Sequence, residues 1–102
     1  MKSAINIFYV SFIFFFLEAQ AREIDVKYLG TIKIDGFKCV LTSSSLINEA
    51  CYQKSSNKLF VSLNGTFYGY CGVDEVLYSN LLQASSLGKF YNEKIRGKFD
   101  CR

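Results

Sequence analysis

Apolar and polar residues alternate in short stretches along much of the chain. Residues 24–34 (IDVKYLGTIKI) alternate in two such stretches, and further stretches follow at 47–53, 58–63 and 66–71. Side chains that change face at every residue are typical of half-buried β-strands. The pattern therefore predicts a small sheet of three central strands, with residues 24–34 as an N-terminal addition.

Two dipeptides mark tight turns between these stretches. Asn64-Gly65 joins the last two central strands, and Asn-Gly is the preferred pair of a type I′ hairpin turn because both positions need a positive φ. Asp35-Gly36 separates IKI from FKC, and we expect a second hairpin there. Serines 43–45 mark another turn, so the central strands are expected to form an antiparallel meander.

The period changes after Gly72. Asp74 can cap a helix with its carboxylate, and apolar residues then recur at helical spacing up to Ala84. Residues 85–88 end this expected helix. The residues after it show no clear periodicity, and we expect a returning tail in which Gly88 and Gly97 are bends.

The Asn64-Gly65 turn also sets the register of the last two strands. It pairs Leu63 with Thr66, Val61 with Tyr68, and Leu59 with Tyr70, and residues that face each other share one side of the sheet. We therefore expect Tyr68 and Tyr70 to pack in the core under the helix. The alternative is an exposed platform on which nucleic-acid bases stack.

The N-terminus resembles a secretory signal peptide. Lys2 supplies a positive start, residues 5–17 are apolar, and Ala19-Gln20-Ala21 has the A-x-A form of a cleavage site. The apolar run is shorter than the roughly 20 residues that span a bilayer, although an uncleaved anchor is an alternative. We expect cleavage after Ala21, a secreted or periplasmic protein, and no stable membrane insertion afterwards.

All four cysteines, Cys39, Cys51, Cys71 and Cys101, follow the expected cleavage site. An even number of cysteines in a small exported domain predicts two disulfides. The chain has no C-x-x-C motif and no histidine, which disfavours a zinc site. We therefore expect neither a metal nor a cofactor.

The strand pattern constrains the disulfide pairing. Cys71 is out of phase with Tyr68 and Tyr70, and Cys51 is out of phase with Ala50 and Tyr52, so both cysteines should lie on the face opposite the tyrosines, with one strand between them. Two strand spacings of about 4.8 Å each are more than a disulfide can bridge. We favour Cys39–Cys51 with Cys71–Cys101, whereas Cys39–Cys71 with Cys51–Cys101 stays open.

Charge and aromatic residues mix in the C-terminal segment SSLGKFYNEKIRGKF, residues 85–99. Its apolar side chains, Phe90, Ile95 and Phe99, are expected to be buried and to hold the segment as a strap. The candidate binding residues are then the outward cations of this region together with two tyrosines: Lys89, Lys94, Arg96, Lys98, Arg102, Tyr68 and Tyr70. The net charge of +3 is compatible with an anionic partner but equally serves solubility.

Catalytic chemistry has little support in the residue inventory. Without histidine the usual general base and the Ser/His and Cys/His pairs are absent, so we expect no enzyme. Asn64-Gly65-Thr66 is an acceptor sequence for N-glycosylation, but we favour the hairpin turn as the reason for Asn64-Gly65, because Asn-Gly is the preferred pair of that turn.

Residues 41–99 resemble the KTSC domain, a family named for its place at the C-terminus of some lysyl-tRNA synthetases. The opening serines and isoleucine, the first-strand tyrosine and the central Y-x-Y match Ser44, Ser45, Ile47, Tyr52, Tyr68 and Tyr70. The family's helix matches Val73, Tyr78, Leu81, Leu82 and Ala84. Its ending S-x-G-K-[YF]-[YF]-N-x-x-I-[KR]-G-K-[YF] matches Ser86, Gly88, Lys89, Phe90, Tyr91, Asn92, Ile95, Arg96, Gly97, Lys98 and Phe99.

The resemblance implies a three-stranded meander followed by a helix and a returning tail. The predicted fold is therefore α+β: a KTSC-like β-β-β-α domain at 41–102, an N-terminal β-hairpin extension at 22–40, and a C-terminal strap, stabilised by disulfides. The chain departs from the family pattern in its signal peptide, its cysteines, its extra hairpin and Asp74, which stands where the family usually has proline.

The expected function is a small exported binding module without catalytic activity. Its expected partner is a protein, as for an inhibitor, an immunity protein or an effector. The alternative is binding of RNA or another polyanion through the basic C-terminal segment, because RNA binding has been suggested for the family from its fusion to a synthetase.

Overall fold

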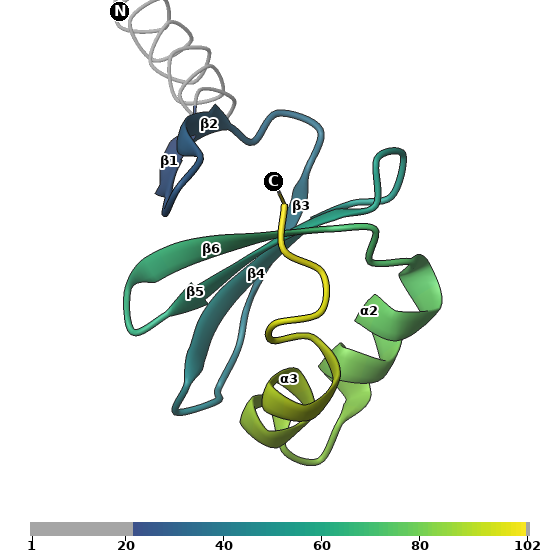
Figure 1. Cartoon of the computed structure of the whole chain (residues 1–102). Helices are drawn as coiled ribbons and strands as arrows, with labels where there is room; N and C mark the ends of the chain where they lie inside the picture. The colour runs from purple at the N-terminus through teal and green to yellow at the C-terminus, as the bar shows by residue number, and fades with distance from the viewer. Residues whose placement is uncertain (1–21, 102) are drawn as a thin grey trace, which may run out of the picture.

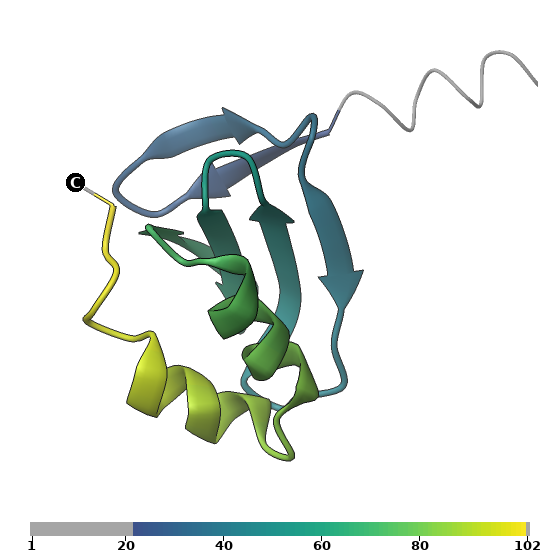
Figure 2. The same ribbon diagram turned by 90° about the vertical axis from the view of Figure 1, so that its right-hand side faces the viewer.

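The computed structural model describes residues 22–101 (Figure 1). The expected signal peptide, residues 1–21, and the candidate binding residue Arg102 lie outside this range. The fold is α+β, as predicted: a six-stranded sheet carries helices α2 and α3 on one face (Figure 2). Between residues 22 and 101 no helix is both long enough and apolar enough to cross a membrane.

The sheet has the strand order β2-β1-β6-β5-β4-β3. Its strands are β1 (Glu23–Val26), β2 (Gly30–Lys33), β3 (Lys38–Leu41), β4 (Ile47–Gln53), β5 (Lys58–Leu63) and β6 (Thr66–Cys71). Neighbouring strands are antiparallel except β1 and β6, which pair in parallel at Val26 and Phe67. The predicted meander β4–β5–β6 is confirmed, with the bounds expected for all three strands.

The N-terminal hairpin differs from the expectation in where it turns. β1 pairs with β2 across a turn at residues 27–29, whereas β2 and β3 lie at opposite edges of the sheet. The hairpin expected at Asp35-Gly36 is therefore wrong. Gly36 does have a positive φ of 82°, so the dipeptide marked a real turn. A local turn signal reports backbone conformation, but it does not determine which strand the following residues will pair with.

The turn between β5 and β6 agrees with the prediction in both conformation and register. Asn64 and Gly65 have φ values of 51° and 90°, as a type I′ turn requires. Val61 faces Tyr68 and Leu59 faces Tyr70, so these side chains share the face that the helices cover.

The first helix, α2 (Glu75–Gln83), begins where the sequence predicted. The carboxylate of Asp74 accepts a hydrogen bond of 2.8 Å from the backbone N–H of Leu77, which satisfies one of the helix's free N-terminal donors. Ala84 is the C-cap.

A second helix, α3 (Leu87–Lys94), lies where an irregular tail was expected. Ser86 caps it by accepting a hydrogen bond of 3.3 Å from the N–H of Lys89. Gly88 therefore lies within a helix and is not a bend. Gly97, with a φ of 75°, is a bend as predicted.

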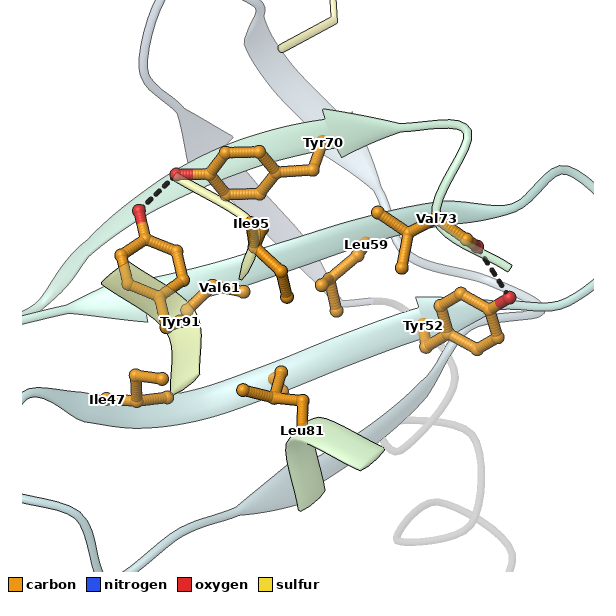
Figure 3. Close-up of a cluster of buried hydrophobic side chains, with 10 residues drawn as sticks. Ile47, Tyr52, Leu59, Val61, Tyr70, Val73, Leu81, Tyr91 and Ile95 are labelled. Carbon is orange, nitrogen blue, oxygen red and sulfur yellow. Dashed lines mark hydrogen bonds between the residues drawn. The ribbon is translucent and has the colours of Figure 1, made fainter. Parts of the chain in front are cut away.

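The front core lies between the meander and the two helices (Figure 3). Leu59, Val61, Leu81 and Ile95 are fully buried in it, and each such side chain contributes about 1.5–3 kcal/mol by leaving water. The hydroxyls of Tyr70 and Tyr91 hydrogen-bond each other, and the Tyr52 hydroxyl donates to the carbonyl of Val73 at 2.8 Å.

A separate back core lies on the other face of the sheet. The sheet curls so that the β1–β2 hairpin packs over β4 and β5, where Ile24, Val26, Ile34, Cys51 and Phe60 are buried together. The disulfide Cys39–Cys51, in the pairing favoured from the sequence, joins β3 to β4 with a Cα–Cα distance of 4.0 Å.

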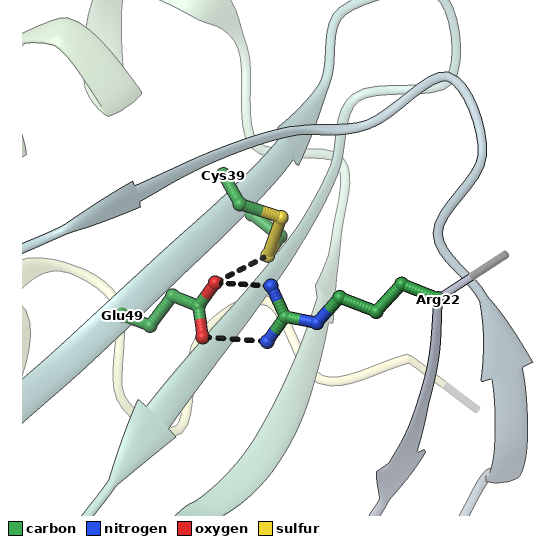
Figure 4. Close-up of a disulfide and its surroundings, with 4 residues drawn as sticks. Arg22, Cys39 and Glu49 are labelled. Carbon is green, nitrogen blue, oxygen red and sulfur yellow. Dashed lines mark hydrogen bonds and ion pairs between the residues drawn. A yellow bond between two sulfur atoms is a disulfide. The ribbon is translucent and has the colours of Figure 1, made fainter. Parts of the chain in front are cut away.

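An ion pair ties the start of the hairpin to the sheet on the same face. The guanidinium of Arg22 donates to both carboxylate oxygens of Glu49, at 2.7 and 2.8 Å, beside the Cys39–Cys51 disulfide (Figure 4). Hydrogen bonding to Glu49 raises the pKa of the Arg22 guanidinium above its already high ordinary value, so this group stays charged.

Residues 87–94 of the predicted strap form helix α3, so the name strap is kept for residues 95–101, which are fastened at both ends. Ile95 is fully buried in the front core. The carbonyl of Phe99 accepts a hydrogen bond of 2.7 Å from the N–H of Cys71, and the Cys71–Cys101 disulfide closes the end, again in the favoured pairing.

Candidate functional site

A groove of about 960 Å³ opens along the outer side of β6. The β1–β2 turn forms one wall, α3 and the strap form the other, and the β5–β6 turn closes one end. Tyr68, Tyr70 and Tyr91 line its interior. A volume of this size falls at the upper end of the range of ligand pockets, and we name this feature the groove.

The deepest tyrosines of the groove belong to the core. Tyr70 and Tyr91 are only 4% and 2% exposed, and their rings meet edge to face. Burial is the main cause that strongly raises the pKa of Tyr70, and the hydrogen bond between its hydroxyl and that of Tyr91 is the second. This hydroxyl is therefore neutral at physiological pH and cannot serve as a tyrosinate base.

The hairpin wall presents a cation between two aromatic rings. The Nζ atom of Lys27 lies 5.6 Å from the ring centroid of Tyr28 and 6.0 Å from that of Tyr68. These distances are those of cation–π contacts. The contacts hold the ammonium at the mouth of the groove.

Tyr28 stands at the tip of the hairpin in a strained conformation. Its φ is 71° and its side chain is 88% exposed. A left-handed backbone is unfavourable for a bulky side chain. Because the Tyr28 side chain is so exposed, its burial contributes little to offset this strain. Strained residues of this kind cluster at functional sites, which makes Tyr28 the first candidate for contact with a partner.

Gly69 lets the hairpin tip approach β6 closely. A Cβ atom built at this position would lie 2.7 Å from Cδ1 of Leu29 and 3.2 Å from the ring of Phe60. Real Cβ atoms do not approach so closely, so a larger residue would displace Leu29. A side chain at residue 69 would therefore require the end of the Leu29 side chain to move and the Phe60 ring to shift by a few tenths of an ångström.

The second wall carries Arg96, Asn92 and Asp100. Arg96 is exposed, and its Nη1 atom lies 3.5 Å from Oδ1 of Asn92, at the outer limit of a hydrogen bond. The disulfide Cys71–Cys101 and the pairing of Tyr70 with Asp100 hold this wall against β6.

The structure brings together only part of the predicted binding set. Tyr68, Tyr70 and Arg96 line the groove, but Tyr70 is buried and works mainly as core. The remaining described cations of the set are exposed and do not line it: Lys89, Lys94 and Lys98.

Sequence reasoning missed the hairpin wall, Lys27, Tyr28 and Leu29. The available signal was an aromatic residue inside a short turn between two predicted strands, where polar or glycine residues are usual. Asn64 is exposed at the groove's end, so glycosylation there stays a prediction.

A second hollow, of about 740 Å³, lies beside α2. Its rings, Tyr52 and Tyr78, stack on each other at 4.3 Å, and burial raises the pKa of both. Lys54 and Glu75 pair across it at 3.2 Å. Because its aromatic rings and its charges already contact each other, it is the weaker candidate.

One cluster in the described range has the composition of a metal site. Ligand atoms of Cys39, Glu49 and Cys51 lie within 4.8 Å of one another. Both sulfurs form the disulfide, however, and a disulfide sulfur is not the thiolate that binds zinc. The cluster is therefore better explained by two structural contacts: the disulfide that joins β3 to β4 and the ion pair of Glu49 with Arg22.

Comparisons with known proteins agree with this fold. The family model described as KTSC domain matches residues 43–99, more than half of the chain. The crystal structure of a KTSC domain protein from Yersinia pestis is similar with a TM-score of 0.61 and 33% sequence identity, over 65% of this chain and 94% of that chain. No curated protein matches the chain.

The matched segment contains the meander, both helices and three tyrosines of the groove, Tyr68, Tyr70 and Tyr91. It excludes the hairpin wall at 27–29 and the end of the strap, Asp100 and Cys101. The resemblance drawn from the sequence is confirmed, and the chain belongs to the KTSC domain family.

Proposed function

We propose that this protein is a small exported binding module without catalytic activity, and that it binds a protein partner in the groove. The observation that carries the proposal is the strained, exposed Tyr28 beside Lys27 at the mouth of the groove. The hairpin that holds them lies outside the family segment. The extension therefore supplies a wall for a surface that the family fold provides.

The composition of the groove favours a protein partner. Tyrosine and arginine are enriched among the residues that dominate binding energy at protein interfaces. Tyr28, Tyr68 and Arg96 bring these side chains to one groove, which the hairpin and the fastened strap hold in place. A rigid surface loses little entropy when it binds.

Two features support action outside the cytoplasm. Residues 1–21 have the layout of a signal peptide. The two disulfides, Cys39–Cys51 and Cys71–Cys101, use every cysteine of the chain, and such bonds persist in oxidising compartments. We therefore propose a secreted or periplasmic location.

Binding of RNA or another polyanion is the second candidate function. The observation that favours it is the exposure of Lys89, Lys94 and Lys98 on α3 and the strap. These cations do not line the groove, and the buried Tyr70 does not present its ring for base stacking. The protein partner is therefore the better-supported candidate.

Photo-crosslinking tests the proposed function. A photoreactive phenylalanine analogue in place of Tyr28 should capture a protein from the extracytoplasmic fraction. Untagged wild-type protein should compete with this capture, and untagged Tyr28→Gly should not. Lys89→Gln, an exposed position outside the groove, is the matched control and should compete like the wild type.

Two results would contradict the proposal. One is competition of equal strength by Tyr28→Gly and the wild type. The other is retention of RNA that Lys94→Glu/Lys98→Glu abolishes and Tyr28→Gly leaves intact, since that result would assign binding to the polyanion surface, with its steep salt dependence.

A further inference from the structure

We propose that the groove recognises an acidic segment of its protein partner, in which carboxylate side chains meet Lys27 on one wall and Arg96 on the other, beside an apolar or aromatic side chain. This inference rests on the proposed function and names the chemistry of the partner. Its basis is the charge of the groove, the geometry of Lys27 and the apolar surface next to it.

The groove carries a positive excess. Its lining includes two cationic side chains, Lys27 and Arg96, and one anionic side chain, Asp100. Charge complementarity at an interface selects partners and guides their encounter. An acidic segment fits this charge balance, whereas a basic one would be repelled from both walls.

Lys27 is placed to bind a carboxylate of the partner. Its ammonium lies near the faces of Tyr28 and Tyr68. A ring face attracts the ammonium through its quadrupole, but it is a weaker acceptor for the three N–H donors than a carboxylate oxygen. The two rings therefore hold the ammonium in place while its donors stay available to a ligand.

Arg96 provides the second contact from the opposite wall. Its guanidinium is exposed, and the contact with Asn92 at 3.5 Å is long. A guanidinium binds a carboxylate through two parallel hydrogen bonds. Arg96 can therefore exchange its weak contact with Asn92 for a charge-assisted one with the partner.

Apolar surface lies next to these charges. Leu29 is 38% exposed at the hairpin tip, and the partly buried Leu46 and Leu63 line the same groove. With the ring of Tyr28 they form a surface on which an apolar or aromatic side chain can pack. The preferred segment therefore combines acidic residues with a central apolar one.

The same groove suits a nucleic-acid strand less well. The other exposed cations of α3 and the strap, Lys89, Lys94 and Lys98, could follow the successive phosphates of a strand, but they lie outside the lining. Tyr68 is half-buried, and Tyr70 and Tyr91 are buried. Of the four tyrosines that line the groove, Tyr28 is therefore the one whose ring is fully available for base stacking.

The experiment measures binding of three acetylated, amidated pentapeptides, EEFEE, QQFQQ and KKFKK, to the purified protein by NMR titration at low salt. EEFEE should shift the amide signals of Tyr28, Gly69 and Arg96 and bind roughly five-fold more tightly than QQFQQ, as expected for exposed charge pairs. KKFKK should bind more weakly than QQFQQ.

Charge reversal sharpens the test. Lys27→Glu/Arg96→Glu should reverse the order, so that KKFKK becomes the preferred peptide. Lys89→Glu/Lys94→Glu makes the same change in net charge outside the groove and should keep the preference for EEFEE. Retention of the wild-type order by the groove variant would overturn the proposal.

The outcomes separate this inference from the proposed function. Equal binding of EEFEE and QQFQQ in the groove would overturn the acidic preference but leave a peptide-binding groove. Shifts confined to other surfaces would contradict both. Stronger shifts of the groove residues by an eight-nucleotide oligouridine than by EEFEE would overturn the acidic segment in favour of nucleic acid.

Discussion

The front and back layers of this molecule are built in different ways. In the front layer α2 and α3 cover the meander, and the packed residues come from nearby strands and helices within the segment that matches the KTSC family. In the back layer a hairpin from outside that segment folds over β4 and β5. It pairs with β6 at a single position, Val26 with Phe67.

This difference shows how an extension can change a family surface. The hairpin buries the back of the sheet, and its tip then reaches past the edge of β6 to become a wall of the groove. One addition therefore covers apolar surface and also places Lys27 and Tyr28 beside the family's tyrosines. The front layer holds the larger hydrophobic core, and the extension adds Lys27 and Tyr28 to the lining of the groove.

The largest expected effect is on the front layer. Leu81→Ala should lower the free energy of unfolding by roughly 2–5 kcal/mol, because it leaves a cavity in a fully buried site. Urea unfolding measures this loss. Ile24→Ala in the back layer should instead release the hairpin locally, seen as faster hydrogen exchange in β1 and β2 with little change in β5. Global unfolding by both variants to the same extent would show that the layers are not separable.

The strap disulfide should come next in size. Cys71→Ser/Cys101→Ser removes a cross-link over 30 residues and should lower the free energy of unfolding by about 2–4 kcal/mol. Because the strap is one wall of the groove, peptide binding should fall as well. Cys39→Ser/Cys51→Ser is the matched control, and it should reduce stability while affecting binding less. The opposite ranking for binding would contradict the assignment of the strap as a wall.

Gly69 tests the contact between the layers. Gly69→Ala should lower the free energy of unfolding by about 1 kcal/mol, because its methyl group crowds the buried Phe60 ring and displaces the end of the Leu29 side chain. Because Leu29 lines the groove, the displaced side chain should also weaken binding there. Leu29→Ala in the same chain should restore part of the stability. A double variant no more stable than Gly69→Ala would show that the crowding lies elsewhere.

Alkaline pH should act through the front layer. Burial raises the pKa of Tyr70 above its usual value, whereas tyrosine in an unfolded chain ionises near pH 10. Above about pH 10 the unfolded state therefore binds fewer protons than the folded state, and the free energy of unfolding falls as pH rises, by up to about 1.4 kcal/mol per pH unit for each such group.

Removing this tyrosine pair tests the origin of the alkaline effect. Tyr70→Phe/Tyr91→Phe should reduce the slope of unfolding free energy between about pH 10 and 11, but not abolish it, because burial also raises the pKa of Tyr52 and Tyr78. Urea unfolding at several pH values measures the slope. An unchanged slope would assign the alkaline effect to other groups.

The parts of the fold with local signals could be predicted from the sequence. Alternation predicted the three central strands, Asn64-Gly65 predicted the register of β5 and β6, and Asp74 predicted the start of α2. The face and spacing of Cys51 and Cys71 excluded a bond between them and left two pairings open, of which the favoured one, Cys39–Cys51 with Cys71–Cys101, is found in the structure.

The parts that depend on distant residues could not. The parallel pairing of β1 with β6 joins segments far apart in the chain, and Asp35-Gly36 gave only a turn. Helix α3 is short and contains Gly88, and packing of Tyr91 in the front core holds it in place. The groove could not be predicted from alternation or from turn residues. It forms only when the curled sheet brings residues 27–29 opposite Arg96.

The smallest effect on stability, and the most direct test of the groove, is expected at Tyr28. Tyr28→Gly relieves a positive φ in an exposed residue and should leave the free energy of unfolding unchanged or raise it by up to about 1 kcal/mol. The decisive measurement compares its affinity for the captured partner with that of the wild type and of Lys89→Gln. A loss of at least roughly ten-fold in a fully folded protein, equivalent to about 1.4 kcal/mol, is predicted for Tyr28→Gly alone. Unchanged affinity in that variant would contradict the assignment of the groove as the binding site.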